Sequence, residues 1–310
     1  MWIGGFRIDE DYTPAKLYEL AKMDGAIILG KDLKKILLAN TQIIPSSKII
    51  TDETGTRHRT AERTAKQTGE LVISISQRRN IITVFKGDFR YTIEDTSKII
   101  PKANQALQTL ENYKKVFDTK LSVLNEYEFN DIVTLDNVIT CLQRAEMVMR
   151  ISEEVNRAIY ELGADGFLVK MQLEELIENL PNEELLIIKD YMAPSRRLVP
   201  EKILNLIRQN AKDGFIDSNT IAKLLGYEVF ENYEEIAVYP KGYRILSKIP
   251  RMPNTIVNNL VKTFKSFQHI LAADIQKLDE VEGIGEVRAR TIKQSLRRMQ
   301  EQFMFDNLML

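Results

Sequence analysis

The chain has 310 residues, of which 44% are apolar and 28% charged, and it carries a net charge of −1. This composition is typical of a soluble globular protein, and at roughly 150 residues per domain the length predicts two or three domains. Because the sequence has neither an apolar run of the roughly 18 residues that span a bilayer nor a secretory signal pattern, we expect a cytoplasmic protein without membrane contact.

Charge is distributed unevenly along the chain. Residues 1–105 carry a net charge of +4, residues 106–240 of −10, and residues 241–310 of +5. Such a distribution can serve solubility alone, or the two basic ends can bind polyanions. Because composition changes at the same positions, we predict three domains with these boundaries.

The first region alternates short β-rich runs with helical sequence, which predicts an α/β domain. A helix is predicted over 57–67, with Gly69 as its C-terminal cap. Residues Ser76–Asn80 are predicted to form the tip of a hairpin. Strands are predicted over residues 26–29, 35–39, 71–75 and 81–85.

Two guanidiniums, an imidazole and two hydroxyls occur together at the start of this predicted helix, in Thr56-Arg57-His58-Arg59-Thr60. At a helix N-terminus such donors can hold a polyphosphate. Taken singly, an Arg-x-Arg sequence is usually a solvated face, and the upstream Asp24-Gly25 is usually a turn. Their combination favours a nucleotide site.

From Ala106 onward the pattern is helical. Apolar residues at spacings of three and four predict one long amphipathic helix that starts there, and a second that begins after Thr134 and ends before Gly163. The single cysteine, Cys141, lies in the second helix and excludes an internal disulfide and a cysteine-built metal site. We expect it to pack in the core and not to act as a nucleophile.

Three shorter helices complete the acidic middle region. The first is predicted over 173–180 and is expected to stop at Pro181. The others are predicted over 183–191 and 201–209. This region therefore reads as an all-helical spine, without a catalytic constellation.

The last region contains a near-repeat at a shift of 32 residues, which predicts two similar helix-turn-helix units packed as a pair. His269, on an apolar helical stretch, is expected to be an ordinary helix residue. The aligned apolar positions are Leu246, Ile249, Met252, Val257 and Leu260 in the first copy and Leu278, Val281, Ile284, Ala289 and Ile292 in the second.

The turn of the second copy resembles the helix-hairpin-helix DNA-binding module, which binds phosphates and reads no base sequence. The alternative is a plain helical turn with capping glycines. In the first copy Pro253 replaces Gly285 and has no N–H group to donate, so we expect that copy to be structural. The expected DNA-binding residues are Gly283, Ile284, Gly285, Arg288, Arg290 and Lys293.

Asp24-Gly25-Ala26 before a strand, residues 55–63 at a helix start and the hairpin tip 76–80 together resemble the diadenylate cyclase domain. With the helical middle and the C-terminal turns, the whole chain resembles the bacterial DNA integrity scanning family, DisA. The resemblance implies an α/β cyclase domain with a mixed sheet flanked by helices, a helical spine, and a tandem helix-hairpin-helix.

The resemblance also implies condensation of two ATP molecules into cyclic di-AMP with release of two pyrophosphates. Asp24 would bind Mg²⁺ or Mn²⁺, and the catalytic residues would be Asp24, Arg57, His58 and Arg59. The two arginines, more than His58, are expected to bind the phosphates. The implied ATP-binding residues are Gly25, Ile43, Thr56, Arg57, His58, Arg59, Thr60, Ser76, Arg78 and Arg79.

Because the product joins two nucleotides symmetrically, two cyclase domains must face each other across a two-fold axis. The resemblance implies a homo-octamer that also binds branched DNA without sequence preference.

Two departures from the family pattern shape the alternative function. The chain starts at a position inside the family's cyclase domain, so we expect an initial helix and strand to be missing, and Gln77 stands where a basic residue is expected. The alternative is a DNA-binding oligomeric scaffold that keeps a nucleotide pocket but has little or no cyclase turnover.

Overall fold

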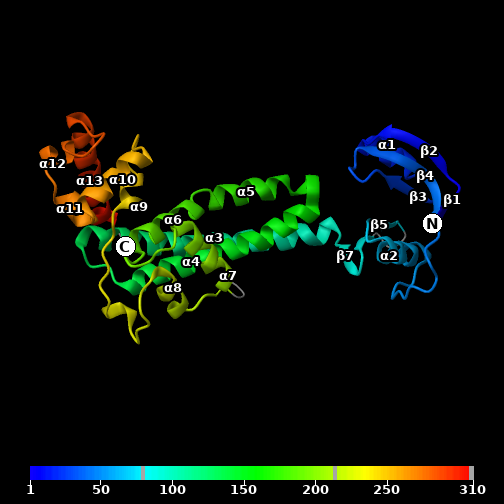
Figure 1. Cartoon of the computed structure of the whole chain (residues 1–310), viewed down its shortest axis with the longest axis horizontal. Helices are drawn as coiled ribbons and strands as arrows, with labels where there is room; N and C mark the ends of the chain where they lie inside the picture. Colours follow the sequence, from blue (N-terminus) through cyan, green and yellow to red (C-terminus); the bar gives the residue numbers. More distant parts are fainter. Residues whose placement is uncertain (78–80, 212–214, 307–310) are drawn as a thin grey trace. The chain divides into compact units, whose positions relative to one another are not determined.

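The computed structural model describes residues 1–77, 81–211 and 215–306 (Figure 1). The chain divides into two compact units, Met1–Ile99 and Ile100–Leu310. The first is α/β and the second is helical, which confirms the predicted fold class. The finer division at residues 105 and 240 stays a prediction.

The first unit contains two sheets and two helices. Its elements are β1 (Trp2–Ile3), β2 (Phe6–Asp11), α1 (Pro14–Leu20), β3 (Ala26–Leu29), β4 (Lys35–Ile43), α2 (Thr56–Thr68), β5 (Leu71–Ser76), β6 (Ile81–Lys86) and β7 (Phe89–Ile93).

All four predicted strands are confirmed, and β4 extends beyond the prediction to Ile43. In one sheet β4 pairs antiparallel with β1, β2 and β3, and in the other β6 lies between β5 and β7. The described strands thus form two antiparallel sheets, whereas the resemblance implies one mixed sheet. The strand β2 was not predicted, because its sequence, FRIDED, is mostly charged and its side chains are mostly exposed.

Helix α2 covers one face of the β5–β6–β7 sheet. Ala61 and Ala65 are buried there against Phe85. The predicted cap is confirmed, because Gly69 adopts a left-handed conformation with φ of 70° that favours glycine. The opposite face of the sheet exposes Leu71 and Ile73 of β5, since alternate residues of a strand point to opposite faces.

The second unit consists of helices connected by turns and loops. Its elements are α3 (Thr96–Asn130, which starts in the first unit), α4 (Leu135–Leu162), η1 (Gly163–Gly166), α5 (Phe167–Ile177), α6 (Leu180–Tyr191), α7 (Pro200–Asn210), α8 (Ser218–Leu225), η2 (Tyr233–Glu235), α9 (Tyr243–Ser247), α10 (Asn254–Phe264), α11 (Phe267–Ala272), α12 (Ile275–Asp279) and α13 (Glu286–Asp306).

The bounds predicted for two helices are wrong. Helix α3 begins at Thr96 instead of Ala106, because the carboxylate of Asp95 accepts the backbone N–H of Ser97 at 2.8 Å and satisfies a donor of the first turn. The helix predicted over 173–180, with a stop at Pro181, instead spans Phe167–Ile177. Pro181 instead lies in the first turn of α6, where its missing N–H has no intrahelical partner to lose.

The predicted spine helix α4 is confirmed. The backbone N–H of Thr134 donates to the side-chain oxygen of Asn137 at 2.9 Å, which fixes the start of the helix. Cys141 is buried in the spine core, and burial raises the pKa of its thiol to about 12. A thiol held in the neutral form is a poor nucleophile, so the predicted packing role is confirmed.

Two carboxyl groups are buried in the spine beside one guanidinium. Glu184 of α6 forms an ion pair of 3.0 Å with Arg208 of α7, and Oε2 of Glu146 on α4 lacks a hydrogen-bond partner among the described residues. Burial raises the pKa of both carboxyl groups, and for Glu184 the charge of Glu146 contributes to a pKa of about 7.

The two C-terminal helix-turn-helix units share one core, as predicted. Leu246, Val257, Leu278 and Ile292 are among the residues buried together in it. The core continues to Phe129 at the end of α3, which packs against Phe267 of α11 at 5.2 Å between ring centroids.

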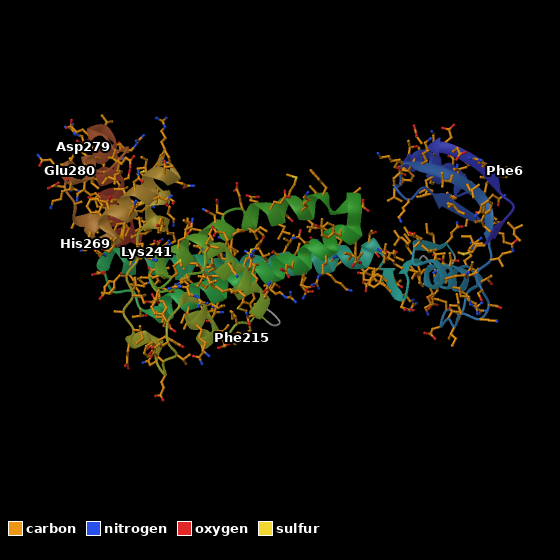
Figure 2. The ribbon with its side chains drawn as sticks, viewed as in Figure 1. Phe6, Phe215, Lys241, His269, Asp279 and Glu280 are labelled. Carbon is orange, nitrogen blue, oxygen red and sulfur yellow. The ribbon has the colours of Figure 1, made fainter. Side chains whose placement is uncertain are left out.

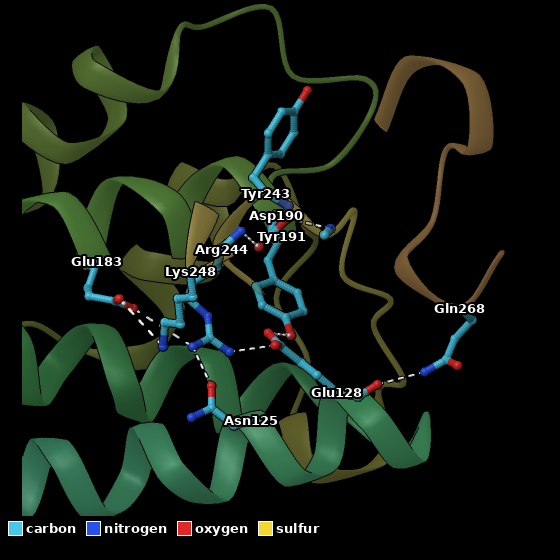
Figure 3. Close-up of polar contacts among 10 residues, drawn as sticks. Asn125, Glu128, Glu183, Asp190, Tyr191, Tyr243, Arg244, Lys248 and Gln268 are labelled. Carbon is cyan, nitrogen blue, oxygen red and sulfur yellow. Dashed lines mark hydrogen bonds and ion pairs between the residues drawn. The ribbon is translucent and has the colours of Figure 1, made fainter. Parts of the chain in front are cut away.

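The guanidinium of Arg244, near the start of α9, is fully buried. It donates to the side-chain oxygens of Asn125 and Glu128 on α3, at 2.5 Å each (Figure 3). The second carboxylate oxygen of Glu128 accepts the hydroxyl of Tyr191 on α6 at 2.7 Å. Glu183, also on α6, lies 3.8 Å from the guanidinium. One buried cation thus connects α9 to both α3 and α6.

The segment before α9 is fixed by a second set of bonds. The carboxylate of Asp190 accepts the backbone N–H groups of residues 242–244 at 2.7 to 2.9 Å. The ammonium of Lys241, labelled in Figure 2, donates to the carbonyls of Lys189 and Met192 at the end of α6. Both sets hold the C-terminal helices against the spine.

We predict that Arg244→Met lowers the free energy of unfolding by about 3–5 kcal/mol, because the substitution leaves the Glu128 charge buried and unpaired. Denaturant titration of the full chain measures the loss. The matched control is Arg150→Met, whose exposed pair with Glu153 contributes under about 1 kcal/mol. Equal effects of the two substitutions would contradict the role of the buried cation.

We also predict that Glu146→Gln changes how stability depends on pH. As pH rises above the ordinary pKa of 4.5, the unfolded chain releases protons that both carboxyl groups keep in the folded chain, for Glu184 up to a pKa of about 7. These carboxyl groups therefore cost stability at high pH. The melting temperatures of variant and unchanged chain should be closest at about pH 4, where Glu146 is mostly protonated in both states, and should favour the variant at about pH 8. The exposed control Glu175→Gln should show no such divergence.

Candidate nucleotide site and nucleic-acid interface

The structure brings Asp24 and Arg57 together, although they are 33 residues apart in the chain. The guanidinium of Arg57, in the first turn of α2, donates to Oδ1 of Asp24 at 2.9 Å. Both side chains are mostly exposed, at 93% for Asp24 and 70% for Arg57. Because both side chains are exposed, they are accessible to a charged ligand. An exposed ion pair of this kind adds little stability, so a ligand could replace it at little cost.

Gly25 is required by the backbone of its own unit. It has a φ of +97°, and an added Cβ would lie 2.9 Å from the backbone carbon of Asn40 on β4. The hydroxyl of Thr41, the next residue of β4, donates to the carbonyl of Ala26 at 2.8 Å. Close contact with β4 therefore fixes the position of the neighbouring Asp24.

The start of α2 offers backbone donors. Its N-cap, Gly55, is extended and has no side chain that could accept the N–H groups of the first turn, and the first intrahelical bond runs from Arg59 to the Gly55 carbonyl at 2.8 Å. Among the described residues no N-cap side chain accepts these N–H groups, and together with the positive end of the helix dipole they favour an anion at this position.

His58 points in a different direction from Arg57. Its Nδ1 lies 3.2 Å from the hydroxyl of Ser74 on β5, and its ring meets Phe85 edge to face at 6.4 Å between centroids. His58 is thus held between α2 and the sheet and does not accompany Arg57 to Asp24. Its role in catalysis stays a prediction.

The other predicted ATP-binding residues that the structure describes lie on β4, α2 and β5. The guanidinium of Arg59 donates to the carbonyl of Thr54 at 3.3 Å, and Ser76 ends β5 opposite Ile81. Arg78 and Arg79 lie outside the described residues. The remaining positions are Ile43 at the end of β4, Thr56 at the first position of α2, and Thr60, whose carbonyl accepts the Thr64 hydroxyl.

The contacts between α2 and the loop 44–55 that leads into it were not predicted from the sequence. One side of α2 contacts this loop through polar side chains. Their spacing of three and four residues places them on one face of the helix, and this pattern could have identified them from the sequence. These side chains are Arg59, Glu62, Arg63, Lys66 and Gln67.

The second C-terminal turn has the geometry of a tight helical hairpin. Gly283 has a φ of +84°, and an added Cβ would lie 2.6 Å from Cδ1 of Ile256. Ile284 is buried and anchors the turn, whereas an added Cβ at Gly285 would meet open space. The N–H of Ala289 donates to the carbonyl of Gly285 at 3.0 Å, which closes the first turn of α13.

The basic residues that follow this turn differ in their contacts. Arg288 donates to the Gly283 carbonyl, and Arg290 pairs with Glu286 at 2.5 Å. The ammonium of Lys293 donates to the carbonyls of Leu271 and Ala273, at 2.7 Å each, and so caps α11. Lys293 thus has a structural partner in addition to its predicted role at DNA.

The first C-terminal turn repeats the backbone of the second with different residues. Arg251 occupies the position of Gly283 and has a φ of +58°. Pro253 occupies the position of Gly285 and caps α10. The two turns therefore share a conformation, and only the second can donate an N–H at the position of Gly285.

His269 of α11, also labelled in Figure 2, contacts the last carbonyl of α10 and the N-cap of its own helix. Its Nδ1 lies 3.1 Å from the Phe264 carbonyl, and its backbone N–H donates to the Ser266 hydroxyl at 3.3 Å. These contacts confirm an ordinary helix residue. In the described part of the chain, none of the helices combines the length and apolar character that a bilayer crossing requires.

Comparison with protein families finds two matches. Residues 1–89 match the family described as DisA bacterial checkpoint controller nucleotide-binding. Residues 93–233 match the family described as DisA bacterial checkpoint controller linker region. The nucleotide-binding match includes Asp24, Arg57 and the start of α2.

Several curated proteins are similar over nearly the whole chain. The DNA integrity scanning protein DisA of Carboxydothermus hydrogenoformans is 54% identical over 299 residues, which cover 96% of this chain and 85% of the relative. The protein of the same name from Acetivibrio thermocellus is 54% identical over 304 residues, covering 98% and 84%. That from Clostridioides difficile is 51% identical over 303 residues, covering 98% and 85%.

Proposed function

The chain belongs to the DisA family of DNA integrity scanning proteins, and we propose that it condenses two ATP molecules into cyclic di-AMP and two pyrophosphates. The observation that carries the proposal is the ion pair between Asp24 and Arg57 beside the open N-terminus of α2. A carboxylate, a guanidinium and unpaired backbone donors in one place suit a polyphosphate and its counterion.

The proposed reaction consists of two equivalent displacements. The 3′-hydroxyl oxygen of each nucleotide attacks the α-phosphorus of the other, an oxygen–phosphorus bond forms, and the bond to the pyrophosphate oxygen breaks. The hydroxyl proton passes to the Asp24 carboxylate or to water. Arg57 and the N–H groups of α2 would stabilise the charge that develops on the phosphates, and Arg59, held at the Thr54 carbonyl, would add attraction at longer range.

Asp24 would also hold the divalent cation, Mg²⁺ or Mn²⁺, that such a reaction uses. In the part of the chain that the structure describes, no three His, Cys, Asp or Glu side chains cluster in a way that could hold a metal. One exposed carboxylate combined with substrate phosphates fits a hard cation of this kind. When bound, the cation would neutralise phosphate charge.

The symmetry of the product calls for two copies of the site. Each copy would bind one ATP, and the hydroxyl of one nucleotide would reach the phosphorus of the other across a two-fold axis. We therefore propose a homo-oligomer with facing cyclase domains, in line with the octamer that the resemblance implies.

The second C-terminal turn is the proposed contact with DNA. Its glycines at 283 and 285 leave N–H groups accessible to a phosphate, and Arg288 and Arg290 follow on α13. Contacts of this type fix the backbone and read no base sequence, which suits recognition of branched or damaged DNA by its shape. We propose that this binding is coupled to the cyclase.

We predict that the full chain, incubated with ATP and Mg²⁺ or Mn²⁺, produces cyclic di-AMP. Asp24→Asn should lower the rate about 100-fold or more, because the variant loses a cation ligand and a proton acceptor. The control Asp88→Asn, at another exposed carboxylate of the same unit, should keep the rate. ATP binding without any product from the unchanged chain would favour the scaffold alternative and refute the proposed enzyme.

We predict that Gly285→Pro weakens binding to branched DNA about tenfold or more, because proline removes one N–H from the phosphate contact. Pro253 shows that this turn accepts proline at the corresponding position. The control Pro253→Ala should leave the affinity unchanged. Affinity should also fall steeply with salt, and a salt-independent affinity would contradict phosphate recognition.

A further inference from the structure

The loop 44–55 lies along one side of α2 and ends at Gly55, the N-cap of the helix. Its backbone is held by side chains from the helix. Arg63 donates to the carbonyl of Ile49 at 2.8 Å, Lys66 donates to that of Ile50 at 3.3 Å, and Gln67 accepts the N–H of Ser46 at 2.8 Å. The loop is thus attached to α2 before the chain enters the helix.

Glu62 is at the centre of these attachments. Its carboxylate is buried, accepts the hydroxyl of Thr51, and pairs with Lys66 at 2.8 Å. Burial alone would raise the pKa of Glu62, but the bonds from Lys66 and Thr51 outweigh it and lower the pKa. The carboxylate therefore stays ionised and remains a strong acceptor for the loop.

The attachment continues from Thr51 towards the helix start. The same hydroxyl oxygen of Thr51 accepts the N–H of Glu53 at 3.2 Å. The carboxylate of Glu53 in turn pairs with Arg90 of β7 at 2.7 Å. A continuous series of polar contacts thus runs from Glu62 on α2 to β7 and passes through the loop two residues before Gly55.

We propose that Glu62 is a positioning residue that holds the turn at Gly55 and Thr56 in the conformation that receives the polyphosphate. The inference rests on the proposed nucleotide site and adds to it a buried group that does not touch the substrate. Without Glu62 the Thr51 hydroxyl loses its acceptor, and the turn is no longer held in one conformation before ATP binds. Ordering the turn on binding then reduces the net free energy of ATP binding. Loss of Glu62 should therefore weaken ATP binding more than it slows the chemical step.

The decisive experiment compares substitutions on the two sides of this contact in the full chain. Thr51→Val and Glu62→Ala should each raise both the dissociation constant and the KM of ATP about tenfold, with kcat changed by less than about twofold. Glu62→Gln keeps an acceptor for Thr51 and should recover most of the affinity. Glu70→Gln, at the exposed carboxylate just after α2, is the control and should behave like the unchanged chain.

The double substitution Thr51→Val with Glu62→Ala should be no worse than either single one, because both remove the same contact. Additive effects, or an unchanged ATP affinity in Thr51→Val, would overturn the positioning role. Calorimetric titration of ATP decides this role even without turnover. A chain that binds ATP but releases no cyclic di-AMP would refute the proposed cyclase while the affinities still test Glu62.

Discussion

The second unit depends on one buried cation. Arg244 has no exposed surface, and a charge removed from water is tolerated only where partners replace its hydration. Those partners come from α3 and α6, while Arg244 itself belongs to α9. Because the guanidinium is planar and its donors diverge at fixed angles, it fixes the mutual positions of the three helices. The C-terminal hairpins are therefore held by the end of the spine, and the chain from Ile100 onward packs as one unit.

Much of the fold could be predicted from local patterns. The periodicity of α4, the cap at Gly69 and the repeat of the two C-terminal turns all depend on residues close in sequence, and each is confirmed. The repeat was informative because Arg251 and Pro253 align with Gly283 and Gly285, so two different pairs of residues adopt one turn. Long, regular patterns with a clear cap leave few alternative structures.

What could not be predicted depends on contacts between distant residues. The charge of Arg244 is the same as that of the exposed arginines of α13, and its partners on α3 and α6, distant in the sequence, make it a core residue. The sequence predicts a helix stop at Pro181, whereas Pro181 lies in the first turn of α6. Proline is compatible with both positions. The sequence of the charged strand β2 likewise contains too few apolar residues to predict a strand, because the buried residues of this pair belong to its partner β4.

The candidate nucleotide site shows the same limit within three consecutive residues. Successive positions on a helix are rotated by about 100°, so Arg57, His58 and Arg59 cannot point the same way. Arg57 reaches Asp24, His58 packs on the sheet with Ala61 and Ala65, and Arg59 joins the polar side of α2 that holds the loop 44–55. The sequence groups these three side chains into one cluster, whereas the helix distributes them over three faces. Arg57 faces the candidate site, His58 the core, and Arg59 the loop that forms the helix start, so the motif combines a candidate binding group with support of its own backbone.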